Sequence, residues 1–191
     1  MERELFFSGI GGQGVQLAAK TLAVAALNSG LQVMIFGSYG GLMRGGNTDA
    51  TIVIGQEELH TPPVVDEAWG ALMMHNYSWP IFKPKLRPGS FVLIDSSVFR
   101  GEIGHDGPVL EIEASTIATE AGMEKAASMV ALGAFVAATG IVTLDALGAA
   151  AFEVLPPYRA KFAETNKKAL EIGYALVPTP FVSAWAERTP A

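Results

Sequence analysis

Two glycine-rich segments near the start of the chain flank one predicted strand–helix–strand unit. Residues 9–14 read GIGGQG, and residues 37–47 read GSYGGLMRGGN. Glycine is required where backbone N–H groups must come close to a ligand or to another chain. The first segment follows the carboxyl end of a predicted strand, which is where α/β folds bind their ligands. The sequence therefore predicts one functional edge built from two glycine-rich loops.

Hydrophobic patterning predicts the fold class. Residues 4–8 and 31–36 have the composition of buried strands, and residues 13–28 between them have apolar side chains at helical spacing. This order predicts a right-handed crossover, a parallel pair of strands and a Rossmann-like first βαβ unit. The expected fold is α/β with three layers, a mostly parallel sheet with helices on both faces. Further strands are expected at 49–55, 69–74, 91–95 and 109–113, and helices at 115–121, 125–139, 144–155 and 158–175.

The length of the chain fits one domain. Its 191 residues are enough for one sizeable hydrophobic core. Residues 1–176 are predicted to form a single α/β domain. Residues 177–191 contain prolines and an isolated Trp185, and they are predicted to form a C-terminal tail that either frays or wraps a neighbouring subunit. The tryptophan favours the second alternative.

The first glycine segment has the spacing of a dinucleotide-binding fingerprint, but it lacks a partner that this function needs. Residues 9–14 satisfy the pattern G-x-G-x-x-G. In that fingerprint a carboxylate about 20 residues further on binds the ribose. Residues 34–36 (MIF) stand there instead, and residues 5–48 contain no Asp or Glu. A dinucleotide held by this chain is therefore disfavoured.

The same segment suits an anion. Gly11, Gly12 and Gln13 precede the predicted helix, where unpaired N–H groups and the helix dipole favour a phosphate or a carboxylate. The side-chain amide of Gln13 adds donor and acceptor groups. The alternative interpretation is that the glycines only permit a tight turn and close packing of the helix.

The second segment carries a single cation, Arg44, among its glycines. Glycines on both sides leave this side chain room to reach a ligand or a partner, whereas the alternative is a solvated loop charge. Ser38, Tyr39 and Asn47 add hydrogen-bonding groups, although packing under the loop is an alternative role for Tyr39. The candidate cofactor-binding residues are Gly11, Gly12, Gln13, Gly14, Ser38, Tyr39, Arg44, Gly45, Gly46 and Asn47.

Composition excludes several classes of function. The net charge of −6 disfavours nucleic acid as a ligand, because phosphate backbones are bound by clustered Lys and Arg. The absence of cysteine excludes thiolate catalysis and Cys-held zinc or iron–sulfur clusters in this chain. His60, His75 and His105 have no partner at metal-ligand or general-base spacing. His75 and Asp95 follow predicted strands at the ligand-binding edge, but a cap or turn is the simpler role for Asp95. No catalytic or metal-binding residue is assigned.

Hydropathy bears on partners and on location. Half of the residues are hydrophobic and 17% are charged, which indicates that a partner covers part of the surface, although an Ala- and Gly-rich monomer has a similar composition. Residues 126–142 form an uncharged run that is too short for a membrane span, so a buried or partner-facing helix is expected. The acidic start of the chain lacks the basic segment of a secretion signal, which predicts a cytoplasmic protein.

Three segments together resemble the gamma subunit of the 2-oxoacid:ferredoxin oxidoreductases. They are residues 9–14 (GIGGQG), 38–47 (SYGGLMRGGN) and 128–133 (SMVALG). The similarity extends through Asn166 and Gly173 to about residue 175. The chain differs in one place, because the family often has YGPEMRGG where this chain has YGGLMRGG. Arg44 therefore lacks the neighbouring carboxylate of the family pattern.

The resemblance implies a thiamine-diphosphate-dependent complex that oxidatively decarboxylates a 2-oxoacid, forms an acyl-CoA and passes electrons to ferredoxin or a related acceptor. Residues 105–107 read HDG and do not supply the family's Gly-Asp-Gly motif, so thiamine diphosphate, magnesium and the iron–sulfur clusters are expected in partner subunits. The implied partners are thiamine-binding, 2-oxoacid-binding and iron–sulfur subunits of a hetero-oligomer. The isolated chain is expected to be inactive, and coenzyme A is the cofactor that its glycine loops would contact.

Three functions remain open from the sequence. In the first, the chain is a gamma-type subunit whose glycine loops help to build or close the active-site cleft. In the second, it is a free-standing dinucleotide-binding oxidoreductase, which the missing carboxylate disfavours. In the third, it is a purely structural assembly subunit whose loops contact only other subunits. The sequence does not select the 2-oxoacid, nor ferredoxin or NAD as the final acceptor.

Overall fold

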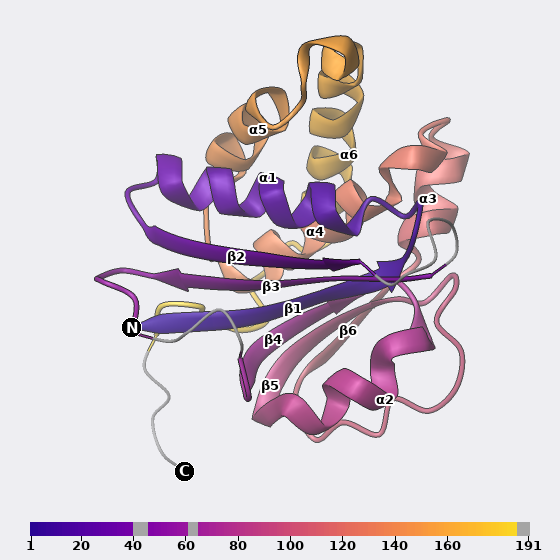
Figure 1. Ribbon diagram of the computed structural model, residues 1–191. Coiled ribbons are helices and arrows are strands. Elements are labelled where there is room, and N and C mark those ends of the chain that lie inside the picture. The colour runs from indigo at the N-terminus through magenta and orange to yellow at the C-terminus, as the bar shows by residue number, and fades with distance from the viewer. Residues whose placement is uncertain (40–45, 61–64, 187–191) are drawn as a thin grey trace.

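The computed structural model describes residues 1–39, 46–60 and 65–186. Its centre is a six-stranded sheet with the strand order β2-β3-β1-β4-β5-β6 (Figure 1). The strands are β1 (Glu2–Ile10), β2 (Gln32–Tyr39), β3 (Asn47–Gly55), β4 (Ala68–Met73), β5 (Leu86–Asp95) and β6 (Val109–Ile112).

The strand–helix–strand order of the first unit is confirmed, but the expected direct pairing of its two strands is wrong. β1 pairs with β4, β4 with β5 and β5 with β6 in parallel. β3 lies between β1 and β2 and is antiparallel to both. Because β2 and β3 are consecutive, an antiparallel pair between them needs only a short connection. The result is a mixed sheet in which β1 and β2 run in the same direction on either side of β3.

Helices cover both faces of the sheet, as the sequence predicts, but unequally (Figure 1). One face carries the short α2 (Trp79–Phe82) between the 3₁₀ turns Asn76–Ser78 and Lys83–Lys85, which the sequence reading missed. Residues 158–162, expected to begin the last helix, lie in a 3₁₀ turn, Pro157–Phe162. The other face carries α1 (Val15–Asn28), α3 (Ala114–Glu120), the turn Glu124–Ala126, α4 (Ala127–Thr139), α5 (Leu144–Glu153) and α6 (Ala163–Ala175).

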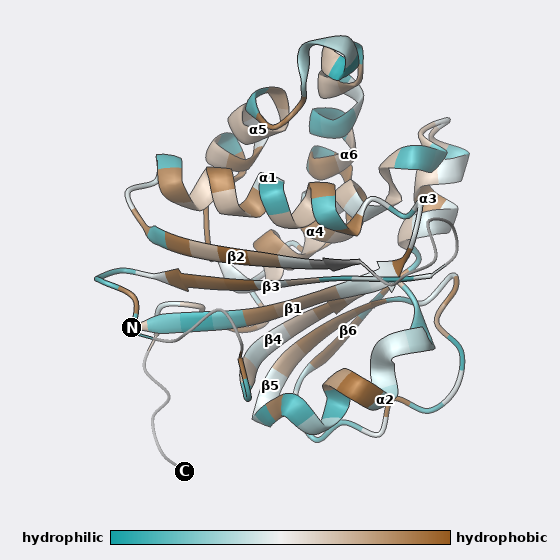
Figure 2. Cartoon of the chain, in the orientation of Figure 1, coloured by the Kyte–Doolittle hydropathy of each residue, from teal (hydrophilic) through white to brown (hydrophobic). Residues whose placement is uncertain are grey.

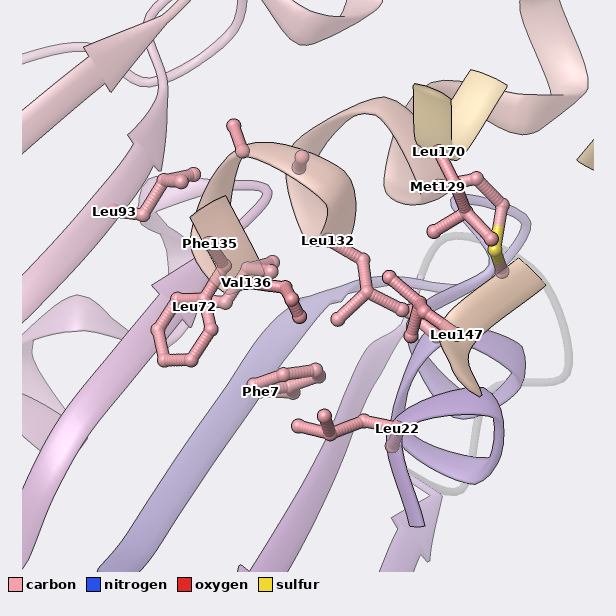
Figure 3. Packing of buried hydrophobic residues seen from close by; sticks show 14 of the residues in the cluster. Phe7, Leu22, Leu72, Leu93, Met129, Leu132, Phe135, Val136, Leu147 and Leu170 are labelled. Atoms are coloured by element: carbon pink, nitrogen blue, oxygen red, sulfur yellow. The ribbon is translucent and has the colours of Figure 1, made fainter. Parts of the chain in front are cut away.

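The main core lies between the sheet and the larger helices, with α4 at its centre. All residues of α4 are buried, so its uncharged sequence is that of a helix surrounded by protein. The Phe135 ring lies 5.6 Å from the Phe7 ring and 5.4 Å from the Phe91 ring, measured between centroids. Leu22 of α1 and Leu147 of α5 pack into the same cluster (Figure 3). A buried helix is thus confirmed here, and within the described residues no helix has the length and apolar character to cross a membrane.

A second, smaller core covers the opposite face of the sheet. Phe6 of β1 packs against Phe82 of α2, with ring centroids 4.8 Å apart. Trp79 packs edge-on against Phe99 and donates its indole N–H to the Ile103 carbonyl (3.0 Å). Figure 2 shows the hydrophobic stretches of the central strands between α2 and the larger helices. These contacts hold in place the turn that follows β4. This turn lies at the carboxyl ends of the parallel strands.

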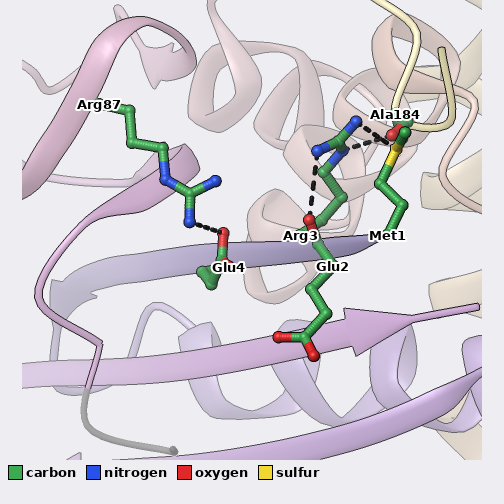
Figure 4. A network of polar contacts seen from close by, with 6 residues as sticks. All are labelled: Met1, Glu2, Arg3, Glu4, Arg87 and Ala184. Carbon is green, nitrogen blue, oxygen red and sulfur yellow. Dashed lines mark hydrogen bonds and ion pairs between the residues drawn. The ribbon is translucent and has the colours of Figure 1, made fainter. Parts of the chain in front are cut away.

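The described part of the C-terminal tail packs on its own chain. The Ala184 amide donates to the Thr139 carbonyl (2.8 Å), and the Trp185 indole N–H donates to the Ile141 carbonyl (3.1 Å). At the amino end of β1 the Arg3 side chain donates to the Ala184 carbonyl (Figure 4). Residues 177–186 therefore close one side of the domain, and their contact with another subunit stays a prediction.

Two glycines allow α4 and α6 to cross with their backbones in contact. A Cβ atom on Gly133 would lie 2.1 Å from the Leu170 carbonyl oxygen, and one on Gly173 would lie 1.8 Å from the Val130 carbonyl oxygen. A helix carbonyl cannot give way without displacing its helix, so a larger residue at either position would push α4 and α6 apart.

We expect Gly173→Ala to lower the free energy of unfolding by at least about 2 kcal/mol, because the new methyl group overlaps a rigid backbone. Gly148→Ala in α5 is the matched control, since its Cβ would meet only the flexible Lys167 side chain, at 3.6 Å. Replacing that helical glycine should raise stability by roughly 0.5–1 kcal/mol. Urea unfolding followed by circular dichroism measures both variants, and equal effects would contradict the close crossing.

Candidate functional site

The strand register brings the two glycine-rich segments to one edge of the sheet. Ile10 at the end of β1 faces Asn47 at the start of β3. The Gly11 amide donates to the Gly46 carbonyl (2.8 Å) and joins the two segments directly. The described parts of these segments at this edge, residues 11–14, 38–39 and 46–47, are called the glycine edge below. The structure thus brings the two segments together, as the sequence predicts.

Part of the second segment is strand rather than loop. β2 continues to Tyr39, and β3 begins at Asn47, so the backbone of Ser38 pairs with that of Asp49. Pairing with β3 extends β2 through Gly37, beyond the strand expected at residues 31–36. Arg44 and Gly45 lie outside the described residues, and their contacts stay a prediction.

The first segment forms the turn into α1. Gly12 and Gly14 have φ values of 104° and 80°, which favour glycine. Within the part of the chain that the structure describes, no side chain caps α1, and its first turn holds no acidic residue. Among the described residues, no acceptor faces the amides of Gly12, Gly14 and Val15. A helix N-terminus with open amides is suited to an anion such as a phosphate.

Gln13 uses both atoms of its side-chain amide inside the protein. Its Oε1 accepts from the Ile10 amide (2.8 Å), and its Nε2 donates to the Met74 carbonyl (3.0 Å). A Cβ on Gly9 would lie 2.6 Å from Gln13 Oε1, so the glycine leaves the space that this side chain occupies. Gln13 therefore ties the ends of β1 and β4 together, and its contact with a ligand stays a prediction.

Gly14 also makes room for the start of α4. A Cβ on Gly14 would lie 2.6 Å from the Oγ of Ser128, a residue that is 1% exposed. The Ser128 hydroxyl has no hydrogen-bond partner among the described residues. Glycine is therefore required at position 14 for two reasons, its left-handed backbone and its contact with α4.

Beneath the edge lies a carboxylate that the sequence reasoning missed. Asp49 Oδ1 accepts from the Ser8 hydroxyl (2.5 Å), and Asp49 Oδ2 accepts from Asn47 Nδ2. Asn47 Oδ1 in turn accepts from the Ser78 hydroxyl. Asp49 is the first acidic residue after residue 4, which was the signal available in the sequence. Ser8, Asn47, Asp49 and Ser78 are called the Asp49 network below.

Burial raises the pKa of Asp49 above its ordinary value, against hydrogen bonds from Ser8, Asn47 and Ser78 that lower it. The folded state therefore binds this proton more tightly than the unfolded state does. The contribution of Asp49 to stability consequently falls as the pH rises from the ordinary aspartate range through the raised folded pKa. Within the described part of the chain, no cationic side chain forms an ion pair with Asp49.

The other polar candidates near this edge act as local caps. His75 Nδ1 accepts from the Tyr77 amide (3.1 Å). Asp95 accepts from the Ser115 hydroxyl (2.5 Å) and from the Ser97 amide (3.1 Å), as the simpler interpretation of Asp95 predicts. The residues that the structure describes contain no group of three or more histidine or acidic side chains placed to hold a metal ion.

A cavity of about 590 Å³ opens at the opposite, amino edge of the sheet. Its arginines are already engaged by the chain itself (Figure 4). Arg87 pairs with the buried Glu4 (2.8 Å). The Arg3 guanidinium lies 5.1 Å from the centre of the Trp69 ring and donates to backbone carbonyls. The glycine edge, with its open amides, is therefore the stronger candidate site.

Comparison with known proteins assigns the family. The model of the pyruvate ferredoxin/flavodoxin oxidoreductase family matches residues 4–176. The chain belongs to this family. The 2-oxoglutarate synthase subunit KorC of Archaeoglobus fulgidus is 32% identical over 177 residues, which cover 92% of this chain and 88% of that protein.

Solved structures of family members share the fold. The gamma subunit of a keto/oxoacid ferredoxin oxidoreductase from Geobacter sulfurreducens superposes with a TM-score of 0.78 at 29% identity, covering 92% of this chain and 95% of that chain. The 2-oxoglutarate:ferredoxin oxidoreductase from Magnetococcus marinus, solved with 2-oxoglutarate, coenzyme A and succinyl-CoA bound, superposes with a TM-score of 0.81 at 21% identity. That match covers 96% of this chain and 33% of the other, so there the fold is one part of a longer chain.

The resemblance read from the three sequence segments is thus confirmed. The chain is a gamma-type subunit of a 2-oxoacid:ferredoxin oxidoreductase, an enzyme complex of several subunits.

We expect Gly14→Ala to lower the free energy of unfolding by about 2 kcal/mol, since the methyl group takes an unfavourable φ and overlaps Ser128 Oγ. In a Ser128→Ala background the nearest remaining atom is the Cβ of residue 128, at 3.7 Å. The cost of Gly14→Ala should then fall to about 1 kcal/mol, which is that of the left-handed backbone alone. Urea unfolding of the four proteins of this cycle gives the coupling, and equal costs in both backgrounds would disprove the contact.

Proposed function

We propose that the glycine edge forms one wall of the active-site cleft of the assembled oxidoreductase and binds coenzyme A there. One observation carries the proposal: among the described residues no acceptor faces the amides of Gly12, Gly14 and Val15, which stand at the start of a helix with no acidic residue in its first turn. Coenzyme A carries phosphates, and a helix N-terminus of this kind favours them. Gly12 is exposed, so a ligand can approach its backbone closely.

The proposed share of this chain in the reaction is binding and closure of the cleft. Thiamine diphosphate and its magnesium ion are assigned to partner subunits, because residues 105–107 (HDG) do not supply the family's Gly-Asp-Gly motif. The iron–sulfur clusters are assigned to partner subunits as well, because this chain has no cysteine to hold a cluster. Those partners are a thiamine-binding, a 2-oxoacid-binding and an iron–sulfur subunit. The isolated chain is accordingly inactive. The partners select the 2-oxoacid and the final electron acceptor.

We expect Gly12→Leu to raise the KM for coenzyme A of the reconstituted complex about tenfold or more, because the side chain covers the open amides of α1. Gly30→Leu is the matched control. Gly30 has a φ of 80° and open space around its Cβ position, as Gly12 has, but it lies at the opposite end of α1. The backbone strain of the two variants is therefore similar.

Steady-state kinetics with varied coenzyme A and a saturating 2-oxoacid measure the effect. Arg44→Ala is expected to act in the same direction, since Arg44 is the one cation of the second segment. An unchanged KM in both Gly12→Leu and Arg44→Ala, in complexes that assemble normally, would contradict coenzyme A binding at this edge and leave the purely structural role.

The dinucleotide-binding alternative has its own test. Asp49 is the acidic residue nearest to the edge along the first three strands, and it is buried in hydrogen bonds to Ser8 and Asn47. Among the described residues of these strands, a ribose therefore finds no exposed carboxylate at the edge. We expect titration of the isolated chain with NAD(P)H to give no fluorescence energy transfer from Trp69 or Trp79 to the nicotinamide. Saturable transfer would instead support dinucleotide binding by this chain.

A further inference from the structure

The Asp49 network shares Asn47 with the glycine edge and continues beneath it, and the binding of an anion by the open amides of α1 does not require it. We propose that Asp49 is a positioning residue for coenzyme A: it fixes the side-chain amide of Asn47, through which the edge contacts the bound cofactor. This inference rests on the proposed function of the edge. It adds one residue that acts without touching the ligand.

The burial of the network shows which member a ligand can reach. Ser8 and Ser78 are fully buried, and Asp49 is 8% exposed. Asn47 is half-buried and is the member of the network at the surface. Its neighbour Gly46 accepts the hydrogen bond from Gly11, so Asn47 stands where the two glycine segments meet. Any effect of Asp49 on a ligand therefore passes through Asn47.

The donors and acceptors of the Asp49 network hold the side-chain amide of Asn47 in one orientation. A charged carboxylate can only accept, so Asp49 Oδ2 must receive a hydrogen from Asn47 Nδ2. The Ser78 hydroxyl donates to Asn47 Oδ1 on the other side. Each atom of the Asn47 amide is thus held by a separate partner, and a flip of the amide would place its oxygen against the carboxylate. Asn47 Nδ2 keeps its second hydrogen for an acceptor on the ligand.

The network also joins two strands and the turn after a third at this edge. Ser8 comes from β1, Asn47 and Asp49 come from β3, and Ser78 comes from the turn after β4. Gln16 of α1 donates its side-chain amide to the Asp49 carbonyl and adds the helix to this group. The position of Asn47 is therefore set by the whole end of the sheet and by α1.

Burying the Asp49 carboxylate costs folding free energy, which argues against a merely structural role for this residue. Burial disfavours its charge, and within the described residues no cation pairs with it. Replacing a buried hydrogen-bonded pair by apolar groups of the same shape can be nearly neutral or stabilising for a fold. A buried carboxylate that is nonetheless supported on both oxygens is suited to orienting a neighbour.

A double-mutant cycle in the reconstituted complex tests the inference. Asn47→Ala and Asp49→Ala should each raise the KM for coenzyme A roughly fivefold, the effect of one lost hydrogen bond, with kcat within about twofold of the original. The double variant should show the same fivefold increase, because Asp49 acts through Asn47. Asp49→Asn should keep the original KM within about twofold, since its Oδ1 can accept from Asn47 while its Nδ2 donates to the Ser8 oxygen.

Asp95→Ala is the matched control, because Asp95 is also a buried carboxylate at the end of a strand and holds Ser97 and Ser115. It should lower thermal stability and leave the KM unchanged. If Asp49→Ala does not assemble, Ser8→Ala takes its place, since it removes the anchor of Asp49 Oδ1 and keeps the carboxylate. It too should raise the KM in the original background and not in the Asn47→Ala background.

The outcomes separate the two proposals. A normal KM in Asp49→Ala, or an increase of roughly 25-fold in the double variant, would overturn the positioning role of Asp49. Coenzyme A binding at the edge would survive either result, provided that Gly12→Leu raises the KM. Normal KM values in Asn47→Ala and Gly12→Leu alike would overturn both proposals.

Discussion

The antiparallel insertion of β3 between β1 and β2 is the constraint on which the candidate site depends. The carboxyl ends of the parallel strands lie at one edge of the sheet. Because β3 is antiparallel to β1 and β2, its amino end lies at the same edge. Polar side chains at the start of β3 therefore meet the turn into α1 and the turn after β4. A direct pair of β1 and β2 would have left no strand to carry Asn47 and Asp49 there.

The main core depends in a similar way on the close crossing of α4 and α6. Gly133 and Gly173 let the two backbones touch, so α4 can lie between the sheet and α6 with every residue buried. An uncharged helix of this kind is stable only when protein surrounds it on all sides. Moving α6 away would therefore expose apolar residues of α4 and destabilise the packing of both helices.

Much of the fold could be predicted from the sequence, because hydrophobic spacing is a local property. It gave the strands at residues 4–8 and 91–95 and the buried helix at 125–139. Pairing is not local, which is why β3 was not expected between β1 and β2. At the site, the glycines and the single edge were predictable. The internal role of Gln13 and the Asp49 network were not, because their partners come from strands far apart in the sequence.

The contact between Gly14 and Ser128 has a consequence for motion. The turn that would receive an anion rests on the first turn of the most buried helix of the domain. Such a turn is restrained on one side, because movement toward α4 is blocked by the close-packed core around that helix. The turn at residues 11–14 is thus supported by the core before any ligand arrives. A ligand that bound to this turn would find its amides already in place, so the turn would lose little conformational entropy on binding.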